Sequence, residues 1–165
     1  MFSFCLINKY YTFVPDVCAS TIQQKQWNYH NINNKNMANL FCVKDKVVII
    51  TGGAGILGRG IAGHLAEEGA KIVILDRAAE TGEQIVAEIK AKGGEASFYL
   101  TDVLNKEVLE QNKKDILAKY GRIDALLNAA GGNMAGATIG PDSTIFDLNI
   151  DAFRKVVDLN LFGTV

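Results

Sequence analysis

The most informative segment of the chain is Val47-Val48-Ile49-Ile50-Thr51-Gly52-Gly53-Ala54-Gly55-Ile56-Leu57-Gly58. Its first half is an apolar run rich in β-branched residues, which is typical of a buried strand, and its second half is rich in glycine, which is typical of a tight turn. Residues 56–69 then predict a helix, because Ile61 and Leu65 share one face and Gly69 provides a stop. The segment therefore predicts a strand, a glycine turn and a helix in direct succession.

The glycines of this turn have the spacing of a dinucleotide-binding site. Gly53-x-Gly55-x-x-Gly58 matches the G-x-G-x-x-G pattern, in which one glycine makes the turn, one admits the phosphates and one packs the helix against the strand. A pyrophosphate binds the free N–H groups of a helix start only where side chains leave the backbone accessible. An ordinary strand-to-helix turn is the alternative. The residues predicted to contact the cofactor here are Thr51, Gly52, Gly53, Gly55, Ile56, Leu57 and Gly58.

An acidic residue follows this turn at a suitable distance. Residues 71–75 predict a second strand that ends at Asp76, close to the gap of about 20 residues that precedes the ribose-binding carboxylate of such sites. Asp76 would accept hydrogen bonds from the adenosine ribose and would repel a 2′-phosphate, so NAD is favoured over NADP. Arg77 keeps NADP open as the less favoured cofactor, because its guanidinium could stack on adenine or offset that repulsion.

Strand and helix patterns alternate through the rest of the chain. Helices are predicted at 83–92 and 106–120, and strands at 96–100 and 123–127. This alternation predicts an α/β, Rossmann-type doubly wound parallel sheet with strand order 3-2-1-4. In that order a ligand crevice lies at the carboxyl ends of the first and fourth strands. At this crevice the glycine turn should lie close to Asn128, Ala129, Ala130 and Gly131, which are also predicted to bind the cofactor.

The third strand runs into Asp102 and Val103, which are predicted to contact the adenine. A carboxylate at this strand end could accept a hydrogen bond from the adenine amino group. A helix N-cap or a turn aspartate is the equally open alternative.

Composition excludes several classes of function. The chain has 165 residues, a net charge of −1 and no basic stripe, so a nucleic-acid partner is not expected. Its three cysteines lack metal or redox spacing, no metal site is expected, and reduced thiols favour the cytoplasm. No apolar run approaches the roughly 20 residues that span a bilayer, so no membrane partner is expected.

Residues 1–36 are rich in Asn, Gln, Tyr and Lys and predict an unstructured leader or a mistaken start, with the domain at 37–165.

Several of these motifs together resemble the short-chain dehydrogenase/reductase family, whose N-terminal, cofactor-binding part the chain matches over residues 44–165. They are Thr51-Gly52 to Gly58, Asp76, Asp102, Asn128-Ala129-Ala130-Gly131 and Asp158-Leu159-Asn160-Leu161-Phe162-Gly163. The chain departs from the family pattern at Ile56, which stands where a glycine is usual, and at Ala129, which stands where a second asparagine is usual.

The resemblance implies an NAD(P)-dependent oxidoreductase. It assigns Asn160 the role of the catalytic helix asparagine, which holds a water through its main chain and links the catalytic lysine to solvent. A solvent-facing helix asparagine is the alternative. The family's catalytic Tyr-x-x-x-Lys pair does not occur here, so the chain as given is expected to be inactive and poorly folded.

Residues 131–138 and 145–148 also resemble the D-mannonate oxidoreductase, or fructuronate reductase, branch of that family. That likeness implies reduction of a keto sugar acid, fructuronate, to D-mannonate with NADH, in a full-length protein that forms a homo-oligomer. Two other readings stay open. One is a non-catalytic module that binds NAD(H) or a partner, and the other is a methyl donor-binding domain, which the Asn128 turn and Asn160 disfavour.

Overall fold

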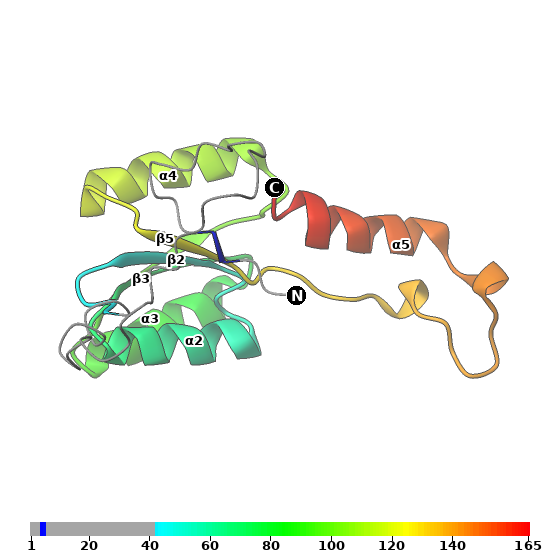
Figure 1. Ribbon diagram of the computed structural model, residues 1–165, viewed down its shortest axis with the longest axis horizontal. Coiled ribbons are helices and arrows are strands. Elements are labelled where there is room, and N and C mark those ends of the chain that lie inside the picture. Colours follow the sequence, from blue (N-terminus) through cyan, green and yellow to red (C-terminus); the bar gives the residue numbers. More distant parts are fainter. Residues whose placement is uncertain (1–3, 6–41) are drawn as a thin grey trace, which may run out of the picture. The chain divides into compact units, whose positions relative to one another are not determined.

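The computed structural model describes residues 4–5 and 42–165, which form a five-stranded sheet and its covering helices (Figure 1). Four strands are parallel and lie in the order β4-β3-β2-β5, which confirms the predicted order 3-2-1-4. Their bounds are β2 (Val47–Thr51), β3 (Lys71–Asp76), β4 (Glu95–Leu100) and β5 (Ala125–Asn128). The predicted α/β doubly wound arrangement is therefore present.

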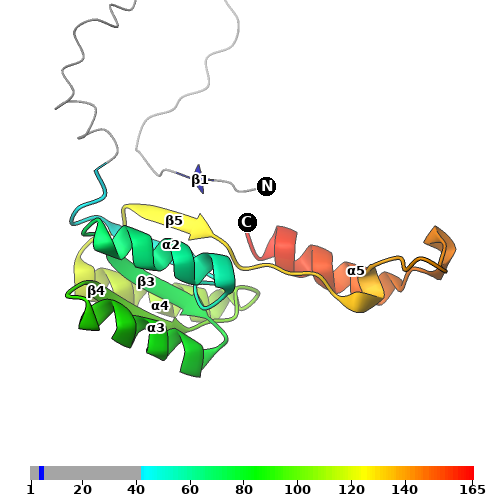
Figure 2. The same ribbon diagram turned by 90° about the horizontal axis from the view of Figure 1, so that it is seen from below.

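Helices cover both faces of this sheet. In Figure 1, α2 and α3 lie below the sheet and α4 lies above it, and Figure 2 shows α2 and α3 side by side. The chain continues after β5 through short helical turns into α5. The bounds are α2 (Ile56–Glu67), α3 (Ala79–Ala91), α4 (Lys106–Tyr120), α5 (Ile150–Val157), and the turns η2 (Ala135–Ala137), η3 (Ile145–Asp147) and η4 (Asp158–Phe162).

The core has two layers, one on each face of the sheet. Ile50, Ile72 and Ile74 are fully buried under α2 and α3, while Val73 and Leu75 point the other way and pack with Ile116 of α4. Strands that are buried on both faces read as continuous apolar runs rather than as alternating ones. This is why residues 47–50 and 72–75 are the clearest strand signals in the sequence.

The start of α3 differs from the prediction. This helix begins at Ala79 rather than near residue 83, although Gly82 lies in its first turn. A Cβ on Gly82 would overlap the ring of Phe98 on β4. Gly82 is therefore a close-packing position between helix and sheet, although in the sequence it looks like a helix breaker.

A two-residue strand pairs with the outer edge of β5. The strand β1 (Phe4–Cys5) runs antiparallel to β5, with Phe4 opposite Leu127 and Cys5 opposite Leu126. Leu126 and Leu127 are therefore paired on both sides, with β1 on one side of β5 and β2 on the other. The rest of the predicted leader, residues 1–36, lies outside the described residues, and its structure stays a prediction.

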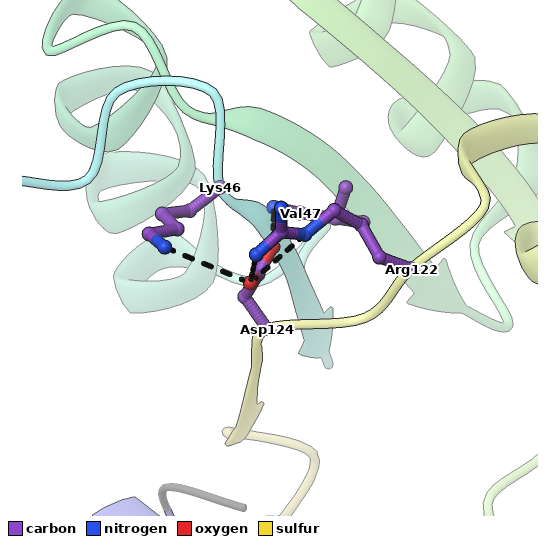
Figure 3. A network of polar contacts seen from close by, with 4 residues as sticks. All are labelled: Lys46, Val47, Arg122 and Asp124. Carbon is purple, nitrogen blue, oxygen red and sulfur yellow. Dashed lines mark hydrogen bonds and ion pairs between the residues drawn. The ribbon is translucent and has the colours of Figure 1, made fainter. Parts of the chain in front are cut away.

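Asp124 joins the beginning of β5 to the beginning of β2 (Figure 3). Its Oδ2 accepts a hydrogen bond from the backbone N–H of Val47 at 2.9 Å, and its Oδ1 accepts from the guanidinium of Arg122. The Nζ of Lys46 lies 3.9 Å from Oδ1. Burial alone would raise the pKa of Asp124, but the hydrogen bonds from Arg122 and Val47 and the charges of Arg122 and Lys46 outweigh it and lower the pKa of this carboxyl.

Replacing Asp124 with alanine is expected to lower the free energy of unfolding by about 1–3 kcal/mol at pH 7, because the N–H of the buried Val47 loses its acceptor. Since the pKa of Asp124 is lowered by folding, its stabilisation is complete above the unfolded pKa of about 3.9 and is lost as the pH falls through the folded value. Urea unfolding at pH 7 and pH 3 measures both effects.

The matched control is Asp142→Ala, which removes an exposed loop carboxylate. This variant should unfold like the wild-type chain at both pH values. Equal stabilities of the Asp124→Ala and Asp142→Ala variants at pH 7 would contradict the assigned role of Asp124.

Candidate functional site

A cleft of about 270 Å³ lies where the carboxyl ends of the four parallel strands meet. Its walls come from the glycine turn after β2, the ends of β3 and β4, the turn after β5, and η4. The residues that line it are Gly52, Ala54, Gly55, Leu75, Asp76, Arg77, Ala78, Thr101, Val103, Ala129, Ala130, Gly131 and Leu159. A crevice at this end of a doubly wound sheet is the usual position of a ligand.

The structure brings many of the predicted cofactor-binding residues together in this cleft. Those that line it are Gly52, Gly55, Asp76, Arg77, Val103, Ala129, Ala130 and Gly131. The other predicted residues are neighbours of these in the chain and do not form the wall, namely Thr51, Gly53, Ile56, Leu57, Gly58, Asp102 and Asn128.

The glycine turn owes its shape to Gly52 more than to Gly53. Gly52 has a φ of +65°, and a Cβ there would lie 2.6 Å from the Cα of Ala130 in the turn after β5. Gly53, which the G-x-G-x-x-G pattern identifies as the turn glycine, instead packs against Ile74, 2.8 Å from where its Cβ would be. Gly52 is therefore the residue that lets the two turns meet, since the left-handed region costs glycine little.

The helix α2 presents free N–H groups to the turn. Gly55 is its N-cap and has no side chain to accept a hydrogen bond, and the first helical bond runs from Arg59 N–H to the Gly55 carbonyl at 2.8 Å. Within the described residues, no acceptor takes the N–H groups of Ile56, Leu57 or Gly58. Free N–H groups and the positive end of the helix dipole together favour an anion.

Ile56 does not obstruct this helix start, although it stands where the family usually has glycine. Its side chain is 95% exposed and lines a separate hollow of about 500 Å³ between α2 and α3, away from the strand ends. The charged groups of that hollow are paired, as Arg59 with Glu88 at 2.8 Å and Lys92 with Glu67 at 3.0 Å. The hollow therefore offers no charge that calls for a ligand.

Asp76 is fixed in the cleft by two backbone N–H groups. Its Oδ2 accepts from Ala54 in the glycine turn at 2.9 Å, and its Oδ1 accepts from Ala78 at 3.0 Å. Each carboxylate oxygen keeps a further lone pair for hydroxyl donors. The exposed Arg77 beside it pairs with no carboxylate in residues 42–165 or 4–5.

Asp102 lies beside the cleft in a turn. Its Oδ1 accepts from the N–H of Leu104 at 3.0 Å, and the N-cap of α4 is Asn105, whose side chain accepts from Val108. Of the two residues predicted to contact adenine, the structure puts Val103 in the wall. Asp102 has the geometry of the turn alternative.

The hydroxyl of Thr51 connects β2 with the turn after β5. It accepts hydrogen bonds from the N–H groups of Ala129 and Ala130, both at 3.2 Å, and Thr51 is only 4% exposed. Asn128 at the end of β5 donates to the carbonyl of Thr164 at 3.5 Å. Thr51 thus holds two residues of the cleft wall, and Asn128 connects the end of β5 to the C-terminal segment.

Asn160 holds the C-terminal helical segment against the turn after β5. Its Oδ1 accepts from the N–H of Gly132 at 3.0 Å, and its Nδ2 donates to the carbonyls of Gly132 and Val156, both at 2.7 Å. Asn160 is exposed, as in the solvent-facing alternative, but its side-chain amide is hydrogen-bonded through both its oxygen and its nitrogen.

The main chain around Asn160 forms a π-helical turn. Gly163 N–H bonds to the carbonyl of Asp158, five residues back, and Thr164 N–H bonds to that of Leu161. The carbonyl of Asn160 accepts instead from the hydroxyl of Thr164 at 3.1 Å. Single π-helical turns of this kind frequently occur at functional sites.

Sequence reasoning missed several residues of the wall, namely Ala54, Leu75, Ala78, Thr101 and Leu159. Four of these adjoin predicted cofactor-binding residues in the chain, and the polar Thr101 at a strand end was a usable signal. Leu159 reaches the cleft from a distant segment and has no local signal. Within the described residues, no helix is long and apolar enough to cross a membrane, and no cluster of His, Cys, Asp and Glu could hold a metal.

Comparisons with known proteins match most of the part of the chain that the structure describes. The family model described as short chain dehydrogenase matches residues 46–165. The oxidoreductase UxuB of Bacillus subtilis is 40% identical over 126 residues, which are 72% of this chain and 45% of that protein.

Solved structures resemble the same part of the chain. A crystal structure of a proposed D-mannonate oxidoreductase from Haemophilus influenzae with bound NAD has a TM-score of 0.69 and 33% identity, covering 78% of this chain and 49% of that one. An NAD⁺-bound xylitol dehydrogenase has a TM-score of 0.64 and 31% identity, covering 73% and 44%. The chain thus spans about half the length of these relatives. It belongs to the short-chain dehydrogenase family.

Proposed function

We propose that the cleft binds NAD(H) and that this chain supplies the cofactor-binding part of an oxidoreductase. The observation that carries the proposal is that one glycine turn connects two complementary groups: the Asp76 carboxylate is bound to the turn through the N–H of Ala54, and the free N–H groups at the start of α2 directly follow the turn. A dinucleotide presents ribose hydroxyls and a pyrophosphate, which require a carboxylate and N–H donors respectively.

The cleft and the helix start that follows it would each hold a part of the ligand. The N–H groups of Ile56, Leu57 and Gly58, which come directly after the cleft-lining Gly55 in the chain, would hold the pyrophosphate, and Asp76 in the cleft would accept from the adenosine ribose hydroxyls. The adenine would be bordered by Val103, with Asp102 beside it, and by Arg77. The nicotinamide end would be bordered by residues 128–131. When bound, NAD(H) supplies a hydride donor or acceptor. The chain's own residues bind and orient it.

We further propose that Asn160 serves catalysis through its main-chain carbonyl. The π-helical turn directs the N–H of Thr164 away from this carbonyl, which keeps a lone pair for a water while accepting from the Thr164 hydroxyl. The side chain of Asn160 fixes the carbonyl's position by its bonds to Gly132. A water held there could relay a proton between the reacting groups and solvent.

The proposed substrate is a keto sugar acid, fructuronate, reduced to D-mannonate. Its support is the likeness to the proposed D-mannonate oxidoreductase, together with the resemblance of residues 131–138 and 145–148 to that branch. Asn133 itself bonds to Thr138 at 2.9 Å within its own loop. We propose that the domain comprises residues 37–165, that the enzyme acts in the cytoplasm and that it forms a homo-oligomer.

Titration calorimetry of the 165-residue chain with NADH, NADPH and S-adenosylmethionine tests the cofactor proposal. NADH is expected to bind about tenfold more tightly than NADPH, a difference of about 1.4 kcal/mol, because Asp76 repels a 2′-phosphate. Tight binding of S-adenosylmethionine without binding of NADH would contradict the proposal and favour a methyl donor-binding domain. Tighter binding of NADPH would overturn the preference for NAD.

A further inference from the structure

A buried hydrogen bond lies behind the cleft, between α4 and the end of β4. Asn112 lies on the sheet-facing side of α4, four residues before Ile116, and is 8% exposed. Its Nδ2 donates to the Oγ1 of Thr101 at 2.7 Å. A buried amide costs free energy unless it is hydrogen-bonded, whereas an apolar side chain at this position would pack on the sheet without that demand. The choice of asparagine therefore points to a role beyond packing.

Thr101 connects this bond to the cleft. It follows β4 directly, is 2% exposed and lines the cleft wall. Its hydroxyl donates to the carbonyl of Tyr99 at 2.9 Å, and its backbone N–H donates to the carbonyl of Asp76 at 2.8 Å. Thr101 is thus held by its own strand, by the neighbouring strand and by α4.

Thr101 lies between the two residues that would contact the adenosine of the ligand. The carboxylate of Asp76 would take the ribose, and Val103, two residues after Thr101, forms the wall. Val103 also lies against Gly163, since a Cβ on that glycine would be 2.9 Å from the Val103 Cγ2. A rotation of Thr101 would therefore move the wall and also its contact with the C-terminal segment.

We propose that Asn112 is a positioning residue for the adenosine end of the cleft. By holding the hydroxyl of Thr101, it sets where Val103 and Asp76 lie relative to the ligand. This inference rests on the proposed function, because it assumes that the cleft binds NAD(H).

The test compares affinities of the 165-residue chain for ADP-ribose and NADH. Asn112→Leu and Thr101→Val are each expected to weaken both ligands about fivefold, the size expected for one lost hydrogen bond. The double variant should also be about fivefold weaker rather than twenty-five-fold, because both changes remove the same interaction. Thr101→Ser keeps the hydroxyl and should bind as the wild-type chain does.

A second hydrogen bond between β4 and α4 provides the matched control. The hydroxyl of Tyr120 lies 2.9 Å from that of Ser97, in the middle of β4 and away from the cleft wall. Tyr120→Phe should lower the stability of the chain, as measured by urea unfolding, but leave both affinities within twofold of wild type. A purely structural role of Asn112 would give its variant the same outcome as Tyr120→Phe.

Three results would overturn the inference. The first is an unchanged affinity for both ligands in Asn112→Leu and Thr101→Val. The second is an equal loss of affinity in Thr101→Ser and Thr101→Val. The third is a loss of affinity in the double variant that equals the product of the two single losses. Where Asn112→Leu fails to fold, the Thr101→Val and Thr101→Ser pair decides. A wild-type chain that binds neither ADP-ribose nor NADH would instead refute the proposed function, and the inference with it.

Discussion

Replacing Gly58 with valine is expected to destabilise the chain by about 3 kcal/mol, near the upper end for overpacking of a tightly packed site. A Cβ at Gly58 would overlap the carbonyl oxygen of Gly52 and would lie 2.7 Å from the Cα of Gly53. Both contacts are with backbone atoms, which cannot rotate away as a side chain does. The helix α2 must then separate from the turn that shapes the cleft. Urea unfolding followed by circular dichroism measures the loss.

Gly60→Val is the matched control for this change. It puts the same side chain into the same helix, two residues further on, where a Cβ meets nothing within 4 Å. Because valine has a slightly better helix propensity than glycine, this variant should be as stable as the wild-type chain or up to about 0.5 kcal/mol more stable. If Gly58→Val were no less stable than Gly60→Val, the close contact between α2 and the turn would be refuted.

Replacing Asp76 with alanine is expected to weaken NADH binding by about 1–3 kcal/mol, because the adenosine ribose hydroxyls lose their acceptor. The change also releases the N–H groups of Ala54 and Ala78, so part of the loss would come from a looser glycine turn. Calorimetric titration gives the dissociation constants of the variant.

The ratio of NADH to NADPH affinity separates the two effects of this substitution. A looser turn weakens both cofactors alike, since both carry the same pyrophosphate. Removing the carboxylate also removes its repulsion of the 2′-phosphate, so the preference for NADH should shrink from about tenfold to less than about threefold. Unchanged dissociation constants would exclude Asp76 from the site.

The order of the strands could be predicted because the sequence pattern and chain topology leave few alternatives. Residues 47–50 and 72–75 are apolar throughout, and the helices between strands require right-handed crossovers. The first residue of a helix was harder to predict, as α3 shows. Gly82 looks like a breaker in sequence, yet it lies within α3 because the Phe98 ring occupies the space of its missing side chain. That contact joins two elements and has no local signature.

The candidate site was predictable where its residues follow a motif, as Gly55 and Asp76 do. It was not predictable where distant segments supply a wall or a support. Leu159 reaches the cleft from η4, and Asn112 supports it from α4 through a contact that spans 11 residues. The role of Gly52 also escaped the motif, because its positive φ and its approach to Ala130 depend on where β5 lies.

The backbone contact between Gly52 and Ala130 has a consequence for the order in which the molecule folds. The bond from Ala129 N–H to the Thr51 hydroxyl links residues 78 positions apart, whereas β2, β3 and β4 follow one another with a single helix between them. Closing the larger loop costs more chain entropy, and such distant pairings form slowly. We therefore expect the cleft to form late in folding, after β2, β3 and β4 have paired. A ligand that fills it would stabilise the docking of β5 on β2 selectively.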